Sequence, residues 1–546
     1  MSNQNVAFYN QVEIDSPNRN RFDLSHELKL TTDFGRLVPC LITEGVPGDT
    51  FILQSEIFAR LAPMRFPVMH RMSATIHFFF VPYRLLFKDW ETFWTGGEKG
   101  DGKNEDGETA VMPTITISPD ISASMTEGSL ADYLGIPPNP MTGIAINAMP
   151  FRAYQLICNE WYRNQNLKDP YKISRNGGPV LKTEWDEQLN IIRNKDWERD
   201  LFTSALPWTQ RGDIVTLPVS VNAQADVRLR KGMYQPTWDD YGIVGQGAEA
   251  AHPVFSNEYG RPLRSIDAVG ALSPDEFSWV AYNPNGSLYA DITGESDAGL
   301  TVNDFRQAIR MQELFELYAR CGARYYEAIL GEFGVRSPDA RLQRPEYIGG
   351  GRTPIVVGEV ISTAETTGED GRKLGDFAGH AMVVGDQNRG KYTVTEFGYI
   401  IGMLSFAPQT GYMQGIERHW FKDDRYDYLH PKLAHLGERP VYNAEVYAVQ
   451  GATDPLGTFG YQPQYAEYRA INSRTAGNFR SSMRDWHLDR VFDEQPTLSP
   501  EFVDCDPGET SRIFNVTDPT VHHLWCQLYH SIHVIRPLPL FGTPSL

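Results

Sequence analysis

The chain has 546 residues and a net charge of −19, from 69 acidic and 50 basic side chains. An acidic excess argues against a dedicated nucleic-acid-binding protein, although a container with one basic wall stays compatible with it. Hydrophobic residues make up 41% of the sequence, which excludes wholesale disorder. The five cysteines are far apart and form no C-x-x-C, so neither a disulfide framework nor a zinc site is expected.

Membrane and secretion signals are also missing from the sequence. No uninterrupted apolar run approaches the ~20 residues that a membrane helix requires. The first twenty residues are polar, unlike those of a secretory signal peptide. We therefore expect a soluble protein that folds in a cytoplasm without membrane insertion.

A strand followed by a helical turn is predicted within Ala74–Gly97. Residues 75–80 alternate between two faces with period two, which is typical of a strand. Pro82 has no N–H and should end the strand. Three apolar residues then fall four apart on one helical face: Leu86, Trp90 and Trp94. Because this face is too apolar to stay wet, we expect Trp90 and Trp94 to pack in a core or anchor a subunit interface.

Further along the chain, short predicted strands are separated by long loops. They lie at Val111–Ile117, Asp213–Val221, Thr353–Ser362, Tyr392–Phe406, Val441–Val449 and Val521–Ile535. Two helices are predicted, at Pro150–Asn166 and Val302–Leu330, the second with Asn303 as N-cap and Gly331 as its stop. His530 interrupts an apolar face of the last strand, where we expect a structural role. The lack of βαβ alternation favours an antiparallel sandwich.

An insertion is predicted at residues 222–300 within a single domain that spans residues 1–546. The stretch Gly242–Gly299 is rich in glycine, alanine, serine and proline, and its hydrophobic periodicity is weak. It contains Asn285-Gly286, a strong hairpin-turn signal. A loop of this length is usually functional or disordered, so we expect an exposed insertion that stands on the sandwich.

No catalytic or cofactor-binding motif is recognisable. Gly97–Lys103 fits the start of a P-loop, but Asn104 stands where a magnesium-binding Ser or Thr is needed. Neither G-x-S-x-G nor H-E-x-x-H occurs. One acidic cluster is compatible with calcium: Asp423, Asp424 and Asp427. A polar turn with internal ion pairs is the more common explanation of such a cluster, and a divalent cation at a subunit interface is the sharper hypothesis.

Two arginine groups are candidates for contact with single-stranded nucleic acid. Arg474, Arg480 and Arg484 lie in Asn472–Arg490, interleaved with aromatic residues, a combination that suits a phosphate backbone and unstacked bases. Such a stretch is more often an ordinary inter-subunit segment. The N-terminal arm supplies the second group, with Arg19 and Arg21.

Several segments, in order along the chain, resemble the coat proteins of microviruses, and the gokushovirus-like branch is the most similar. The strongest match is PYRLLFKDWETFWTGG, at residues 82–97. The others are Asn20–His26, Val38–Asp49, Ala62–His70 and the ending RPLPLFGTPSL, which includes Phe541, a further candidate interface anchor. No single motif is diagnostic, and the specificity comes from their order and number.

This resemblance implies an eight-stranded antiparallel jelly-roll sandwich with long loop insertions and a few helices. It implies a major capsid protein whose pentamers build an icosahedral shell of sixty copies around circular single-stranded DNA. Minor or pilot proteins, small DNA-packaging or scaffold proteins and a host surface receptor would be its partners. The protein would be part of the virion, assembled in the cytoplasm of a host bacterium, with the insertion projecting outward at the three-fold axes.

Two other classes of protein remain compatible with the sequence. The first is a β-sandwich carbohydrate-binding or carbohydrate-active protein, because aromatic-rich loops with scattered acids are typical of that class. The second is an appendage or spike protein that forms trimers or small rings. A convergent carboxylate pair in a cleft would favour the first class, and closed shells would exclude both.

Overall fold

The computed structural model describes residues 18–97, 99–104, 106–213, 215, 226–229, 288–291, 302–322, 324–361, 377–516, 518 and 520–541. It divides the chain into two compact units. One unit comprises Met1–Gly212 and Leu314–Leu546, and the other comprises Asp213–Glu313. The first unit holds a large sheet and the elements that pack on it.

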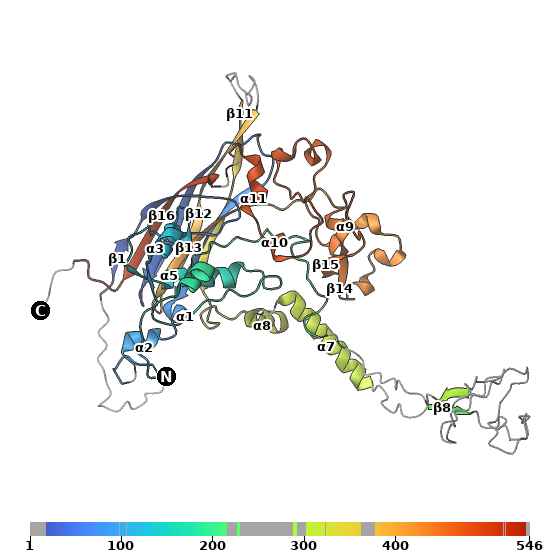
Figure 1. Ribbon diagram of the computed structural model, residues 1–546, viewed down its shortest axis with the longest axis horizontal. Helices are drawn as coiled ribbons and strands as arrows, with labels where there is room; N and C mark the ends of the chain where they lie inside the picture. Colours follow the sequence, from blue (N-terminus) through green and yellow to red (C-terminus); the bar gives the residue numbers. More distant parts are fainter. Residues whose placement is uncertain are drawn as a thin grey trace, which may run out of the picture. The chain divides into compact units, whose positions relative to one another are not determined.

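Ten antiparallel strands form this sheet, which curls on itself (Figure 1). They are β1 (Asn20–Asp23), β2 (His26–Thr32), β3 (Val38–Gly45), β4 (Thr50–Leu61), β5 (Met72–Pro82), β10 (Glu346–Pro354), β11 (Val356–Ile361), β12 (Phe377–Thr393), β13 (Gly398–Pro408) and β16 (Leu524–Arg536). The path runs β16-β4-β12-β10-β5-β13-β3, with β1 and β2 on β16 and β11 on β12.

Eight of these strands form a jelly roll. One half is β2-β16-β4-β12 and the other is β10-β5-β13-β3, joined where β10 and β12 pair at two positions, Gly349 with Gly390 and Gly350 with Arg389. From β2 to β16 the chain crosses between the halves at every step except β5 to β10. This is the wrapping that defines a jelly roll, so the predicted fold class is confirmed, with β1 and β11 as additions.

The interior core lies between the two halves, and the strand alternation produces it. In β4, every second residue from Phe51 to Leu61 is buried, and the residues between them face outward. In β5 both faces are buried. Ile76, Phe78 and Phe80 join the interior core, whereas Phe79 and Val81 join a second apolar cluster outside the sandwich. The predicted alternation is therefore confirmed, and Pro82 is the last residue of β5.

His530 of β16 is fully buried within this interior core, as the sequence predicted for a structural histidine. Its Nδ1 lies 2.6 Å from the Ser55 hydroxyl of β4. Burial lowers the pKa of His530 to about 4, because the charged ring would lose its hydration. The imidazole therefore sits neutral in the core at neutral pH.

The insertion between β5 and β10 covers the outer face of the β10-β5-β13-β3 half. Its helices and strands in the first unit are α1 (Tyr83–Leu86), α2 (Trp90–Thr95), β6 (Thr114–Thr116), α3 (Pro119–Ser124), α4 (Leu130–Tyr133), β7 (Ala145–Asn147), α5 (Met149–Ile157), α6 (Lys182–Glu184), α8 (Tyr325–Phe333) and the π-helical turns Cys158–Tyr162 and Trp185–Leu189. Phe151, Tyr154 and Trp185 are buried against residues of β5 and β13 in the second apolar cluster.

The insertion between β13 and β16 is built mostly from short turns. It contains β14 (Glu438–Tyr442), α9 (Asn443–Val446), β15 (Thr458–Pro463), α10 (Pro500–Val503), α11 (Pro507–Thr510) and seven 3-10 turns, at Arg418–Phe421, Arg425–Asp427, Pro431–Leu433, Ala466–Tyr468, Gly477–Arg480, Arg484–Trp486 and Ser511–Ile513. A small apolar cluster around Phe202, Phe459 and Phe502 holds it together.

The second unit contains the residues predicted as an exposed insertion. Within it the structure describes β8 (Asp226–Leu229) paired antiparallel with β9 (Leu288–Asp291), and the first part of α7 (Val302–Cys321). Apart from β8 and β9, residues 222–300 lie outside the described residues, and so does the hairpin signal Asn285-Gly286. Most of the strand predicted at Asp213–Val221 also lies outside them.

Two of the predicted strands differ in their bounds from the observed strands. Tyr392–Phe406 covers the end of β12 and most of β13, which four residues separate. Val111–Ile117 contains the three-residue strand β6. The strands predicted at Thr353–Ser362 and Val521–Ile535 correspond to β11 and β16. Local pattern detected these strands but could not place the turns between them.

Two further predictions are wrong for local reasons. The strand predicted at Val441–Val449 ends at Tyr442, because Glu445 accepts a hydrogen bond from the Tyr442 N–H at 2.9 Å and starts α9. The helix predicted at Val302–Leu330 is two helices, α7 and α8, since Gly322 takes a left-handed φ of 111° between them. Asn303 lies within α7, and α8 continues past Gly331 to a left-handed C-cap at Gly334.

Candidate functional site

The sandwich has two ends, and the predicted site residues divide between them. At the end that we call the Pro82 end, β5 and β16 finish and β4 and β13 begin. At the opposite end, the Met72 end, β5 and β16 begin, and the insertion between β13 and β16 emerges. The 13 residues of β16 span ~40 Å between these ends.

The two predicted arginine groups lie at opposite ends of the sandwich. Arg21 pairs with Ile535 in β1, and Arg19 lies against Gly48, so both belong to the Pro82 end. Arg474, Arg480 and Arg484 belong to the insertion at the Met72 end. The structure therefore does not combine them into one basic surface within a single chain.

The aromatic residues interleaved with the second arginine group pack inside the chain. Trp486 stacks on Phe66, with ring centroids 5.2 Å apart, and Phe479 meets the His487 ring edge-on at 5.8 Å. Arg480 donates from Nε to the Thr475 carbonyl at 2.8 Å. These two rings are thus engaged in holding the segment in place.

The three predicted interface anchors follow strands that finish at the Pro82 end. Trp94 is 61% exposed and packs on Phe397 at 4.4 Å, and its ring also stacks on Trp90 at 6.1 Å. Phe541 is 76% exposed and follows β16 by five residues. The expected single helical turn is two short helices, α1 and α2, which leave Leu86 buried and Trp94 at the surface.

The acidic cluster forms a polar turn. The Asp427 carboxylate accepts hydrogen bonds from the backbone N–H groups of Asp424 at 3.1 Å and Asp423 at 3.4 Å. The Asp424 N–H holds the pKa of Asp427 below its ordinary value. Among the described residues, no group of three or more His, Cys, Asp or Glu side chains is arranged to hold a metal ion.

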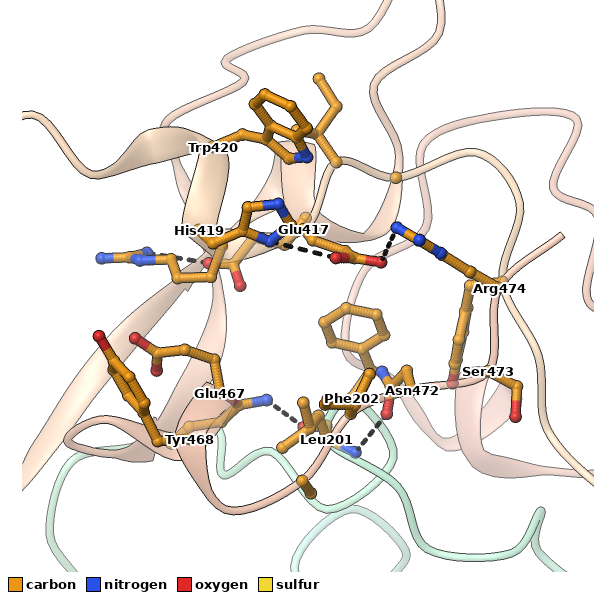
Figure 2. Close-up of a pocket in the computed structure, with 18 of the residues that line it drawn as sticks. Leu201, Phe202, Glu417, His419, Trp420, Glu467, Tyr468, Asn472, Ser473 and Arg474 are labelled. Carbon is orange, nitrogen blue, oxygen red and sulfur yellow. Dashed lines mark hydrogen bonds and ion pairs between the residues drawn. The ribbon is translucent and has the colours of Figure 1, made fainter. Parts of the chain in front are cut away.

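A cavity of about 650 Å³ opens in the insertion at the Met72 end (Figure 2). Its walls come from the 3-10 turn Arg418–Phe421, from residues 467–474 and from Leu201 and Phe202 of the other insertion. The Asn472 carboxamide accepts from the Leu201 N–H at 3.1 Å, which fixes one wall to the other.

Ion pairs run through the walls of this cavity. Glu417 accepts from Arg474 at 2.9 Å and lies 3.1 Å from His419 Nδ1. Glu467 pairs with Lys422 at 3.0 Å and also with Arg439. Burial alone would raise the pKa of Glu467, but the hydrogen bond from Lys422 and the charge of Arg439 hold it below its ordinary value. The cavity walls therefore stay charged at neutral pH.

Large apolar side chains surround the same cavity and remain exposed. Trp420 is 73% exposed and Ile471 is 84% exposed. Tyr468, which also lines the cavity, is 51% exposed. These residues follow neither period two nor period 3.6, so no local pattern predicted them. Isolated aromatic and aliphatic side chains within a strongly charged stretch, as in residues 416–428, were the available signal.

A family model for "Capsid protein (F protein)" matches residues 10–546. The chain belongs to this capsid protein family. Three curated relatives match over nearly their whole lengths. Capsid protein VP1 of Bdellovibrio phage phiMH2K is 34% identical, with 100% of this chain and 98% of the relative covered. VP1 of Chlamydia phage 1 is 33% identical, with 98% and 97% covered. VP1 of Spiroplasma virus 4 is 30% identical, with 97% and 95% covered.

Membership in the capsid protein family confirms the resemblance to microvirus coat proteins. This capsid protein is a structural component of the virion and not an enzyme, so the carbohydrate-active alternative is set aside. In the described parts of the chain, no helix combines the length and apolar character needed to cross a bilayer. The features around the cavity are accordingly best considered as surfaces for contact.

Proposed function

We propose that this major capsid protein assembles itself into a closed icosahedral shell, through pentamers and sixty copies, around circular single-stranded DNA. The observation that carries the proposal is the match of the whole chain to capsid proteins, from residue 10 to residue 546. A jelly roll with an insertion at each end supports it, because each copy needs different patches for different neighbours. Contacts of about 1,600 Å² each would suffice when every subunit makes several.

The charge of the chain shapes how assembly would proceed. Copies with a net charge of −19 repel one another, so salt or divalent cations should promote closure. In the assembled particle, Asp423, Asp424 and Asp427 are our candidates for a cation at a subunit interface. Particle yield that stays flat or falls across an ionic-strength series would contradict this part of the proposal.

Packaged DNA would contact the arginines at the two ends of the sandwich. Arg19 and Arg21 form one candidate contact, and Arg474, Arg480 and Arg484 form the other. Because the chain is acidic, small basic packaging proteins, polyamines or metal ions should share the neutralisation of the genome. Minor or pilot proteins and scaffold proteins of the phage are further proposed partners, and assembly would take place in the bacterial cytoplasm.

Residues 222–300 are our candidate for recognition of the host surface. The support is their composition, which is the least core-like of the chain. A variant that lacks these residues should form particles that do not attach to host cells. Loss of particles altogether would make the segment architectural instead.

Electron microscopy of the purified full-length protein tests the central proposal. Closed shells of uniform size, formed in added salt and containing DNA when it is supplied, are expected. Trimers or small rings under every condition would instead favour an appendage protein. A chain that stays monomeric under every condition, measured by sedimentation velocity, would overturn self-assembly.

A further inference from the structure

Exposed apolar side chains form a surface around the cavity in Figure 2, which we call the Trp420 surface. It comprises Ile416, Trp420, Tyr428, Tyr468 and Ile471, each at least 40% exposed. Side chains of this size and exposure gain substantially from burial, and contiguous patches of them mark contact sites. Trp, Tyr and Arg are also the residues that most often carry the binding energy of protein interfaces.

The charges of this surface favour a protein partner with an acidic contact segment. The cavity walls carry five cationic side chains against three carboxylates, a net charge of +2: Arg418, Lys422, Arg439, Arg474 and Arg480 against Glu417, Glu445 and Glu467. Arg480 forms no ion pair with a carboxylate among the described residues. Its charge is therefore free to meet an incoming anionic group.

Single-stranded DNA fits the same surface less well, so this inference removes Arg474 and Arg480 from the proposed DNA contact and leaves Arg484, which does not line the cavity. Glu417 and Glu467 line the cavity, and their carboxylates would repel phosphates that enter it (Figure 2). Four of the five cations are already paired with carboxylates of the walls. Ile471 offers no ring on which a base could stack. An apolar and acidic protein segment satisfies all three features.

A surface with these complementary properties lies at the Pro82 end of the sandwich. We call it the Trp94 surface, and it comprises the exposed rings of Phe93 and Trp94 together with the described residues 99–104 and 106–108. From Trp90 to Glu108 the sequence has six acidic and two basic residues, a net charge of −4. Asp101, Asp106 and Glu108 are exposed.

The two surfaces lie at opposite ends of the same sandwich, since α2 follows the end of β5 and the Trp420 surface belongs to the insertion that emerges where β5 begins. A contact between opposite ends of identical copies is heterologous, and it closes into rings when the rotation between copies allows. We propose that the Trp420 surface of one copy binds the Trp94 surface of a second copy. This inference rests on the proposed self-assembly, and the complementary charges would set its orientation.

Charge reversal in the full-length protein tests this contact. Arg480→Glu should reduce the fraction of protein in shells at least tenfold at fixed concentration and salt, and Asp106→Lys with Glu108→Lys should do the same. Combining the three substitutions should restore assembly to within about threefold of the wild type, because attraction returns with the opposite polarity. Particle yield is measured by sedimentation velocity and checked by electron microscopy.

Matched controls separate this contact from folding and from general surface effects. Arg336→Glu reverses an exposed arginine outside both surfaces and should leave the yield unchanged. Trp420→Ala should reduce assembly, whereas Trp525→Ala, at a 46% exposed tryptophan of β16, should not. Urea unfolding of each variant verifies that the fold is intact.

Three outcomes decide between the alternatives. Wild-type yield for Arg480→Glu, with the fold intact, overturns the inference. Normal shells that contain less DNA, judged from the absorbance ratio at 260 and 280 nm, also overturn it and assign the surface to nucleic acid. If the wild type forms no shell, concentration-dependent pairing of full-length chains still tests the contact. Pairing that Arg480→Glu abolishes would then support the contact although the proposed function had failed.

Discussion

The two insertions of the jelly roll differ in how much aromatic surface they bury against the sandwich. The insertion between β5 and β10 buries Phe151 and Trp185 there and exposes the rings of α2. The insertion between β13 and β16 leaves Trp420 and Tyr468 at its surface, and a small apolar cluster and ion pairs hold its turns together. We conclude that most of the first insertion belongs to the folded core, whereas the second has only a small core of its own. This difference leads to measurable differences in stability.

The largest effect on stability is expected for Trp185→Ala in the first insertion. The Trp185 ring is fully buried, packs on Phe151 at 4.9 Å and donates its N–H to Ser124 Oγ at 2.9 Å. Its loss leaves a cavity and removes this hydrogen bond, although the Ser124 hydroxyl still donates to the Ile121 carbonyl at 2.7 Å. The free energy of unfolding should therefore fall by about 3–5 kcal/mol. Urea unfolding of the monomeric chain measures this. A loss below about 1 kcal/mol would mean that this insertion does not share the core.

The titration of His530 in the sandwich comes next in size. Because burial lowers the pKa of His530 to about 4, the unfolded chain binds a proton first as the pH falls. Stability from this group is therefore complete above about pH 6.5 and declines toward pH 4, by about 3 kcal/mol. His530→Gln should flatten this part of the stability profile. An unchanged slope in the variant would assign the decline to other groups.

A smaller effect is expected where the two insertions meet. Lys168 pairs with Asp196 at 2.5 Å in the first insertion and also with Asp504 in the second. Burial raises the pKa of Asp196 to about 6, so its ionised form depends on this ammonium. Lys168→Met should lower the unfolding free energy by about 2 kcal/mol, less than for a fully buried pair because Asp504 is partly exposed.

Lys182→Met provides the matched control for the contact between the two insertions. The Lys182 ammonium pairs with Asp186 at 3.1 Å on the exposed surface, where such pairs contribute at most about 1 kcal/mol. If both variants lose the same unfolding free energy, the ion pairs of Lys168 between the insertions are no stronger than a surface pair. Urea unfolding at neutral pH measures both.

The smallest effect on stability is expected for Trp420→Ala in the second insertion. Because this ring is 73% exposed, the unfolding free energy should change by no more than about 0.5 kcal/mol. A loss comparable to that of Trp185→Ala would erase the distinction between the two insertions. Thermal and urea unfolding of the same preparation measure it.

The strands with strong local patterns were predictable, and those that depend on distant partners were not. β5 and β16 alternate so clearly that their inward faces, including His530, followed from the sequence. β4 alternates in the structure but carries apolar Ile52 and Phe58 on its outward face, which hides its period. β10 was missed because glycines occupy its centre. The resemblance implied a jelly roll, but the strand order could not be predicted, since long loops leave register undetermined.

The candidate site was predictable only in part, for a different reason. Arg474 and Arg480 stood out by composition, and they line the cavity. The cavity itself also needs Glu417 and Leu201, which are distant in the sequence and meet this segment only in the folded chain. Spacing along the chain contains no information on such contacts. The acidic residues Asp423 and Asp424 were expected at a turn, and their backbone hydrogen bonds agree with that expectation.

The narrow junction between β10 and β12 has a mechanical consequence. Only glycine fits at Gly349, where a Cβ would lie 2.4 Å from the Arg389 carbonyl oxygen. β10 and β12 pair at only two positions, so few backbone hydrogen bonds link the two halves of the jelly roll along this line. If packaged DNA presses outward on the shell, the pairing between β10 and β12 should break before the pairing within either half. A filled particle would then deform within its subunits.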